Sequence, residues 1–426
     1  MKFISSCRSL CLLTAFAACP TFGQDGLPST PSQAPVPKHS TASNAETASL
    51  SSQARFSAAT SESQGVNPAA LERLSDLVNG FVEADEIVGA ELLVIKNRRT
   101  ILHEVFGMDD GSENQTMRRD TIFSIRSMTK PLTGAMAQML VDEGVLQLSE
   151  HVAKYIPAFD TDASRGITIE HLLTHRSGLP MRSPGALWSN YASYNNIREI
   201  ADYWGKYGPR LFKPGEQYHY ADANVDTLAA VIQQAAGQPT ESLIQRRLLE
   251  PLGMHDTIPL LRQGDERVTR VATKYAGGRG RWRPFWKWNG KPYFSFPMFA
   301  QGFYSTASDY ACFLAMLADG GVVAEQRLLS QAAVERILTP VSQTTMPTGC
   351  ARLDSSYGQL MHLYHQKGEV TVFGHSGSDG TYAWVWPRQD LMVLYFTQSR
   401  GSTTMTRMEA VLDSLLGRPI APISGQ

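Results

Sequence analysis

The chain has 426 residues, of which 42% are hydrophobic, so it is long enough to bury a large core. Its 39 basic and 40 acidic residues nearly cancel. This balance excludes a broad electrostatic attraction to nucleic acid or to an anionic membrane, and it favours a small-molecule or peptide substrate with little charge.

The first 23 residues are typical of an export signal. Lys2 and Arg8 supply positive charge, and the apolar stretch 10–18 is too short to span a bilayer comfortably. Cleavage after Gly23 and lipidation of Cys19 are both open, because residues 16–19 resemble a lipoprotein box. The sequence therefore predicts an exported chain, periplasmic or secreted, with or without a lipid anchor and with no transmembrane segment.

Residues 24–65 are rich in Ser, Thr, Ala, Gln and Pro and contain few large apolar side chains. A segment of this composition cannot bury enough apolar surface to offset the entropy lost on ordering. We therefore expect a flexible linker between the signal and a folded domain.

A folded domain is predicted over residues 66–420. A helix should begin at Asn67-Pro68, since proline is favoured at the first helical position. The elements expected after it are strands at 89–96 and 100–107 joined by a turn at 97–98, a helix at 127–143, a helical and loop-rich region to about 300, a helix at 308–317, strands at 357–364, 369–375, 381–386 and 391–398, and a final helix at 404–416.

This order predicts an α+β fold. The antiparallel sheet would be built from both chain ends, about 66–126 and 300–420, and would be flanked by helices. The part between them, about 127–299, would form an inserted, mostly helical domain.

Ser127 and Lys130 form a Ser-x-x-Lys motif. On a helix, residues i and i+3 share a face, so Lys130 can approach the Ser127 hydroxyl. The apolar stretch 132–141 would desolvate the lysine, which lowers the pKa of an ammonium group and lets it accept a proton. A serine becomes a nucleophile only with such a neighbour. Because four-residue matches are common by chance, a capping serine beside a solvated lysine is the alternative.

Longer strings give this motif a context. They resemble, in chain order, segments of the serine β-lactamase and penicillin-binding-protein superfamily, especially its class C β-lactamase, DD-peptidase and esterase branch, where Ser-x-x-Lys carries the nucleophile. The resemblance covers about residues 66–420 and implies the same fold and a serine hydrolase that acts through an acyl-enzyme. The matching strings are residues 122–131, 167–180, 214–222, 251–254, 302–310 and 374–381.

Tyr220 matches the tyrosine of the family's Tyr-x-Asn motif, with Tyr218 as the rival position. The resemblance implies that Tyr220, held by Lys130, takes the serine proton and later protonates the leaving group. The third position is Asp222 instead of Asn. Its negative charge would keep Lys130 protonated and favour Tyr220 as the base, although the sequence leaves the choice between Lys130 and Tyr220 open.

His375-Ser376-Gly377 stands where many family members carry Lys-Thr-Gly. The resemblance implies that the backbone N–H groups of Ser127 and Ser378 form the oxyanion hole, with Gly377 beside the substrate. His375 would orient or protonate substrate instead of supplying a permanent cation. This departure argues against β-lactams, whose carboxylate often meets the lysine.

Residues 279–294 alternate cations and aromatic side chains, and Asn289-Gly290 is a strong hairpin-turn signal. We interpret this segment as a lid over the pocket, with Trp286 and Trp288 as candidate substrate contacts. Binding of glycan, membrane or nucleic acid by the same side chains is the alternative.

No metal or cofactor is predicted. His171 and His175 stand four residues apart but lack the glutamate of a metalloprotease motif. Both fall within the matching string 167–180, where the resemblance implies structural roles. Outside the signal the chain keeps Cys312 and Cys350, for which a disulfide in an oxidising compartment and a buried thiol at Cys312 are both open.

Three functions remain as hypotheses. The first is an exported hydrolase of an ester or amide, and the second is a cell-wall peptidase of the DD-carboxypeptidase kind. The third is a non-catalytic binding or scaffold protein on the same fold. Retention of Ser127, Lys130 and Tyr220 favours an enzyme. The sequence carries no signal for an oligomeric state.

Overall fold

The computed structural model of the chain describes residues 56–111, 113–181, 194–343 and 354–420. The predicted signal, its candidate lipidation site Cys19 and most of the predicted linker lie outside the described residues. The end of that linker belongs to the packed body, because Phe56 is buried and Ala58 forms a parallel bridge with Thr100. Burial of Phe56 and backbone hydrogen bonds between residues 57–59 and Thr100 together hold this otherwise polar segment against the sheet.

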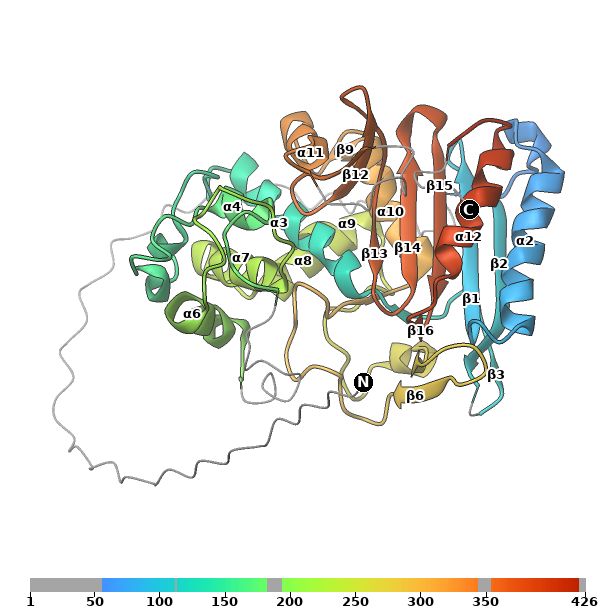
Figure 1. The fold of residues 1–426 in the computed structure, drawn as a ribbon, viewed down its shortest axis with the longest axis horizontal. Helices are drawn as coiled ribbons and strands as arrows, with labels where there is room; N and C mark the ends of the chain where they lie inside the picture. The colour runs from blue at the N-terminus through green and yellow to red at the C-terminus, as the bar shows by residue number, and fades with distance from the viewer. Residues whose placement is uncertain (1–55, 112, 182–193, 344–353, 421–426) are drawn as a thin grey trace, which may run out of the picture. The chain divides into compact units, whose positions relative to one another are not determined.

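The main element is a nine-stranded sheet with the order β10-β11-β12-β13-β14-β15-β1-β2-β3. Figure 1 labels its strands from β12 to β3. The two chain ends meet where β1 pairs antiparallel with β15, from Ala90 opposite Thr397 to Lys96 opposite Leu391. The predicted α+β fold with a sheet drawn from both ends is therefore confirmed. The strands are β1 (Gly89–Lys96), β2 (Arg99–Asp110), β3 (Gln115–Thr116), β10 (Ser342–Gln343), β11 (Asp354–Tyr357), β12 (His362–Gln366), β13 (Glu369–Gly377), β14 (Thr381–Trp386) and β15 (Leu391–Thr397).

Two turns in this sheet test the local predictions. Asn97 and Arg98 have φ angles of 51° and 58°, the left-handed pair of a tight hairpin, so the predicted turn between β1 and β2 is confirmed. The single strand predicted at 357–364 is wrong. Residues 358–361 form a turn, with Leu360 at φ 57°, and separate β11 from β12. The apolar side chains of this turn, Leu360 and Met361, are buried in the core. A run of apolar residues therefore looks like a strand in the sequence although the backbone turns.

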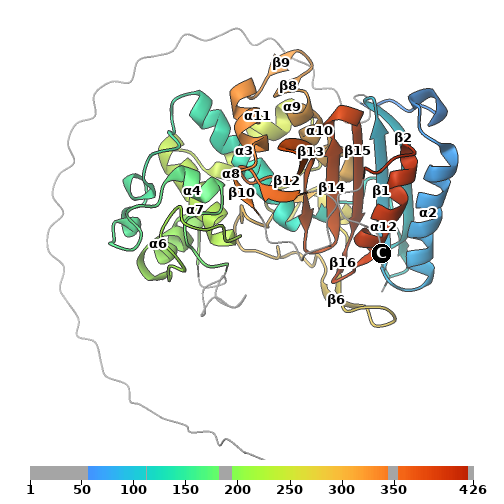
Figure 2. The ribbon, with the colours of Figure 1, turned by 45° about the horizontal axis from the view of Figure 1, so that its top comes forward.

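Helices cover both faces of the sheet (Figures 1 and 2). Helices α2 (Pro68–Glu83) and α12 (Thr404–Leu412) lie on one face, where Leu92 and Val94 of β1 join their hydrophobic cluster. Helix α10 (Ala307–Ala318) packs against the other face, with the alternate residues Leu93 and Ile95. Side chains alternate across a strand, so residues 92–95 of β1 are all apolar because both faces of the strand are buried.

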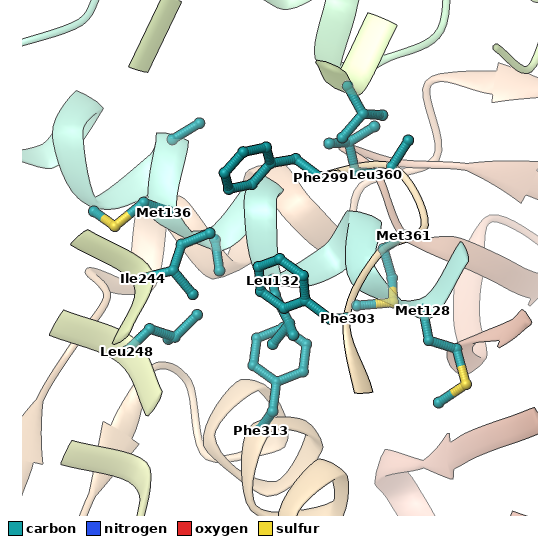
Figure 3. Close-up of a cluster of buried hydrophobic side chains, with 14 of the residues drawn as sticks. Met128, Leu132, Met136, Ile244, Leu248, Phe299, Phe303, Phe313, Leu360 and Met361 are labelled. Carbon is teal, nitrogen blue, oxygen red and sulfur yellow. The ribbon is translucent and has the colours of Figure 1, made fainter. Parts of the chain in front are cut away.

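The chain between β3 and α10 carries most of the remaining helices. They lie beside the end of the sheet that is opposite to β2 (Figure 1). Helix α3 is buried from Thr129 to Leu140, and Figure 3 shows its Leu132 and Met136 among Ile244, Leu248 and three phenylalanines. This central position fixes the start of α3, where Ser127 lies. The helices are α3 (Thr129–Asp142), α4 (Ile169–Leu173), α6 (Ile197–Tyr207), α7 (Asp222–Ala236), α8 (Thr240–Ile244) and α9 (Glu250–Leu252), with α11 (Gln331–Leu338) following α10.

Three small sheets complete the described residues. They are β16-β5-β6, β4-β7 and β8-β9, made of β4 (Phe123–Ser124), β5 (Lys274–Ala276), β6 (Arg283–Trp286), β7 (Tyr304–Ser305), β8 (Val322–Val323), β9 (Gln326–Arg327) and β16 (Ser399–Arg400). Among the residues that the structure describes, no helix is long and apolar enough to cross a membrane.

The hairpin predicted at Asn289-Gly290 is wrong. Gly290 makes a turn at φ 87°, but no strand follows it, and β6 pairs instead with the preceding β5. Pro292 supplies a reason, since proline lacks the N–H that a strand at this point would need for pairing.

Candidate active site

Ser127 lies in a single 3₁₀ turn, Arg126–Met128, directly before α3. Its side chain is half-buried, whereas Lys130, one turn later, is fully buried. Lys130 Nζ lies 3.2 Å from Ser127 Oγ and donates to it. The structure therefore brings together the two residues of the Ser-x-x-Lys motif in the way that the i, i+3 spacing predicts.

Lys130 Nζ makes two further hydrogen bonds, 2.7 Å to Asp222 Oδ1 and 2.8 Å to the carbonyl oxygen of Ala300. Burial alone lowers the pKa of this ammonium group, but the charge of Asp222 and the contact with Tyr220 outweigh it and hold the pKa above its usual value. Lys130 is therefore a cation at neutral pH and a poor proton acceptor.

Asp222 is the first residue of α7 and is nearly buried. A carboxylate is favoured at a helix N-terminus, where unpaired N–H groups and the helix dipole attract negative charge. Asp226, one turn further along α7, accepts hydrogen bonds of 3.1 Å from the N–H groups of Phe299 and Ala300. Asp226 thereby fixes the carbonyl that receives Lys130, a role that the sequence analysis missed.

Tyr220 lies just before the start of α7, and its ring centroid lies 4.7 Å from Lys130 Nζ. Burial raises the pKa of Tyr220, and the charge of Asp222 raises it further, while Lys130 and Ser127 act in the opposite direction. The rival Tyr218 belongs to the same aromatic group, with its ring 6.1 Å from His175 and 5.8 Å from Tyr357. Of the two tyrosines, Tyr220 is the one beside the Lys130 ammonium group.

His175 packs against the ring of Tyr220 and hydrogen-bonds to the residues that follow it. Its ring lies 4.7 Å from that of Tyr220, and its Nδ1 accepts from the N–H of Ala221 at 3.3 Å and pairs with Asn224 Nδ2 at 3.0 Å. Burial and the charge of Lys130 hold the pKa of His175 well below its usual value, so the ring is neutral. The structure gives His171 different partners, since its Nδ1 accepts from the N–H of Thr168 at the start of α4.

His375 on β13 is buried beside Tyr220, with ring centroids 6.4 Å apart. Its Nδ1 lies 2.8 Å from the carbonyl oxygen of Ser376 and must donate to it, so Nε2 accepts from the hydroxyl of Tyr357. Burial, followed by the charge of Lys130, lowers the pKa of His375 to about 3. His375 is therefore a neutral group that Tyr357 holds in place, and the sequence analysis missed Tyr357.

Gly377 ends β13 and lies directly against the segment that leads to Ser127. A Cβ atom at Gly377 would stand 2.4 Å from the carbonyl oxygen of Ile125, so only glycine fits there. Ser378 follows as an exposed residue in the turn between β13 and β14. The two segments that carry Ser127 and Ser378 are thus in van der Waals contact.

Trp286 and Trp288 pack against a separate small cluster formed by Ile122, Ile258 and Tyr304. Trp286 lies 5.9 Å from the ring of Tyr304 and 5.0 Å from Lys274 Nζ. The structure brings together Ser127, Lys130, Tyr220, Asp222 and His375, and it places these two tryptophans in another group of contacts. Whether either one touches substrate stays a prediction.

Cys312 is buried within α10, where its Sγ lies 3.5 Å from the carbonyl oxygen of Ser308. Cys350, the other half of the considered disulfide, lies outside the described residues. The pairing stays a prediction.

Comparison with known proteins identifies the family. A family model described as Beta-lactamase matches residues 74–417. The chain belongs to the beta-lactamase family. The predicted resemblance is confirmed, and all five residues of the assembled group lie within the matched range.

Proteins similar to this chain include an esterase in sequence and a penicillin-binding-protein homologue in fold. Esterase EstB from Burkholderia gladioli is 29% identical over 202 residues, which are 43% of this chain and 50% of EstB. The matched part thus spans about half the length of that relative. The structure of EstCE1, described as a hydrolase with promiscuous acyltransferase activity, aligns with a TM-score of 0.68 at 19% identity over 82% of this chain and 99% of EstCE1.

An octameric penicillin-binding protein homologue from Pyrococcus abyssi aligns with a TM-score of 0.69 at 24% identity, over 82% of this chain and 78% of the homologue. At these identities the structural matches show a shared fold. The chain is therefore a member of a beta-lactamase-fold hydrolase family with esterase and acyltransferase neighbours.

Proposed function

We propose that the protein is an exported serine hydrolase that cleaves a carboxylic ester, or an amide, through an acyl-enzyme on Ser127. The observation that carries the proposal is the position of Lys130 Nζ, 3.2 Å from Ser127 Oγ and 4.7 Å from the Tyr220 ring. A hydroxyl, a cation and a phenol in this arrangement can move one proton between a nucleophile and a leaving group.

In the proposed acylation, Tyr220 accepts the proton of Ser127 while Oγ attacks the substrate carbonyl. Lys130 stays charged, because the carboxylate of Asp222 holds it so, and its ammonium group stabilises the tyrosinate. Burial raises the pKa of Tyr220, so the reactive tyrosinate is a minor form at neutral pH. The rate of acylation should therefore rise with pH.

The developing oxyanion would accept hydrogen bonds from the backbone N–H groups of Ser127 and Ser378. Fixed donors of this kind are worth about 3–4 kcal/mol each in serine hydrolases. Tyr220 then gives its proton to the leaving alcohol, and the same groups act on a water molecule to release the acid.

The substrate group that faces β13 should be uncharged. His375 is neutral at any working pH, since burial lowers its pKa to about 3, and its ring nitrogens are occupied by Tyr357 and Ser376. A neutral histidine gives a substrate carboxylate much less attraction than a lysine at this position would. This favours an uncharged ester over a β-lactam or a peptide with a free carboxylate, and esterase relatives support the same choice.

The proposal is tested by intact-mass measurement after incubation with a fluorophosphonate, on wild type, Ser127→Ala and the control Ser124→Ala. We expect one adduct on wild type and on Ser124→Ala and none on Ser127→Ala. Hydrolysis of p-nitrophenyl acetate should follow the same pattern. A lasting penicillin adduct with turnover of a D-Ala-D-Ala peptide, and no ester hydrolysis, would establish the peptidase instead. An unmodified wild type would exclude a nucleophilic Ser127.

Export is proposed from residues 1–23 alone. Mass measurement of the mature protein from a bacterial host should give a start after Gly23 or a lipidated Cys19. Recovery of the full-length chain from the cytoplasm would contradict export.

A further inference from the structure

A cluster of charged side chains adjoins the two segments that carry Ser127 and Ser378. Its members are Arg126, Lys274, Asp379 and Arg400. Asp379 accepts a hydrogen bond of 2.6 Å from Arg126 Nε and one of 2.7 Å from Arg400 Nε, and Lys274 Nζ lies 3.5 Å away. Arg126 and Asp379 are each 1% exposed. Burial opposes ionisation of Asp379, but the charges of Arg126, Lys274 and Arg400 outweigh it and hold the pKa of this carboxyl well below its usual range.

Arg126 and Asp379 are each adjacent in sequence to one of the two proposed oxyanion donors. Arg126 directly precedes Ser127, and Asp379 directly follows Ser378. The ion pair between them therefore joins, across 253 positions of sequence, the two backbone segments whose N–H groups must converge on one oxygen atom. A shift of either segment would move one donor relative to the other.

The backbone at this point needs such a restraint. Arg126 has a φ of 45°, in the left-handed region, which costs a residue with a side chain about 1–2 kcal/mol. Thr381 Oγ1 donates to the carbonyl oxygen of Ile125 at 3.5 Å, and Gly377 contacts the same carbonyl. Both contacts involve the single carbonyl group of Ile125, and the ion pair adds a second connection one residue closer to Ser127.

Aromatic side chains close the cluster from the other side. The guanidinium carbon of Arg126 lies 4.7 Å from the ring of Tyr293, and Lys274 Nζ lies 3.8 Å from the same ring. Phe285 lies 4.3 Å from the guanidinium carbon of Arg400. These rings exclude water, which strengthens the attraction between Arg126 and Asp379 and makes the loss of either partner costly.

We propose that Arg126 and Asp379 are positioning residues that hold the N–H groups of Ser127 and Ser378 in the geometry of an oxyanion hole. Neither side chain need touch substrate. The inference rests on the proposed function, since it presupposes attack by Ser127. It goes beyond that function by assigning the transition-state geometry to an ion pair outside the reacting group.

The test compares kcat and KM for p-nitrophenyl acetate in wild type, Arg126→Met, Asp379→Asn and Arg126→Lys. Arg98→Met is the control, because Arg98 also forms long-range ion pairs, with Asp319 and Asp390, but none of these residues adjoins Ser127 or Ser378 in sequence. Rates are normalised to the folded fraction from circular dichroism. We expect kcat to fall by about 10²–10³-fold in Arg126→Met and Asp379→Asn, as for loss of one oxyanion donor, with KM changed by less than about threefold.

Arg126→Lys should recover part of the lost kcat, and Arg98→Met should match wild type. The affinity for a phenylboronic acid, whose tetrahedral adduct on serine needs the oxyanion hole, should fall in parallel with kcat. If a single variant does not fold, Arg126→Met combined with Asp379→Asn carries the test and should show the same loss of kcat, because it removes one charge of each sign and leaves an amide oxygen that can accept from Arg400.

A wild-type kcat and boronate affinity in folded Arg126→Met, Asp379→Asn or the double variant would overturn the positioning role while leaving the proposed hydrolase intact. A rise in KM at unchanged kcat would also overturn it. Failure of wild type itself to hydrolyse the ester or to bind the boronate would instead overturn the proposed function, and this inference with it.

Discussion

Lys130 and Asp222 form a buried ion pair in which Nζ and Oδ1 are 2.7 Å apart, one turn of helix from Ser127. The pair bears on the choice of base, because the charge of Asp222 holds the pKa of Lys130 above its usual value and so disfavours Lys130 as the proton acceptor. Burial raises the pKa of Tyr220, and the negative charge of Asp222 raises it further because it opposes ionisation of the phenol.

Asp222→Asn should move the rise of kcat/KM with pH toward lower pH. Removal of the carboxylate charge takes away one cause of the raised pKa of Tyr220, so tyrosinate forms more easily. The amide oxygen of asparagine can still accept from Lys130. The measurement is the pH–rate profile of wild type and Asp222→Asn, with Asp202→Asn on α6, an exposed ion-pair partner, as control. A profile that stays in place would argue against Tyr220 as the titrating base.

Tyr220→Phe should lose about 10²–10⁴-fold in kcat, the usual contribution of a general base. Tyr218→Phe is the matched control, since Tyr218 packs against His175 and Tyr357 as Tyr220 does, whereas the Lys130 ammonium group lies over the ring of Tyr220. Rates of ester hydrolysis and of labelling by fluorophosphonate should fall together in Tyr220→Phe alone. Equal losses in both variants would point to packing of the aromatic group instead of proton transfer.

His375→Gln should keep the shape of the pH–rate profile between pH 5 and pH 9. Burial lowers the pKa of His375 to about 3, so the ring of the wild type carries no charge anywhere in that range. Glutamine preserves a polar partner for Tyr357. An inflection between pH 6 and pH 7 in wild type that His375→Gln lacks would show that His375 titrates and would contradict its neutral state.

Asp226→Asn should stabilise the protein at neutral pH. Burial, then the charge of Asp222, raises the pKa of Asp226 to about 7, above its unfolded value near 3.8. The folded state therefore opposes ionisation of Asp226, and this lowers the free energy of unfolding of the wild type. The loss is absent below pH 4, grows between pH 4 and pH 7 and is complete above pH 7. The difference of about 3 between the folded and unfolded pKa values corresponds to a free energy of at most about 4 kcal/mol.

Urea unfolding of wild type and Asp226→Asn at pH 4.5, 6 and 8 measures this effect. The advantage of the variant should grow with pH and then level off, because the asparagine oxygen still accepts from Phe299 and Ala300. Asp162→Asn on the surface should behave like wild type at every pH. A difference that is independent of pH would contradict the assignment.

The fold and the family followed from local information. The i, i+3 spacing of Ser127 and Lys130, the turn at Asn97-Arg98 and the order of the elements are properties of short segments, and the structure keeps all of them. The local patterns predicted the wrong elements at residues 358–361, where apolar side chains face the core from a turn, and after Gly290, where Pro292 lacks the N–H that a pairing strand needs.

By itself, the sequence predicted the sheet drawn from both chain ends through its periodicity and the approach of Lys130 to Ser127 through their spacing, whereas the tyrosine candidates came from the resemblance to the family. Only the tertiary structure decided the charges. Asp222 meets Lys130 across 92 positions, and Asp379 meets Arg126 across 253. The protonation state of a buried group depends on its solvation and on the charges within a few ångströms, and distant segments supply both when the chain folds.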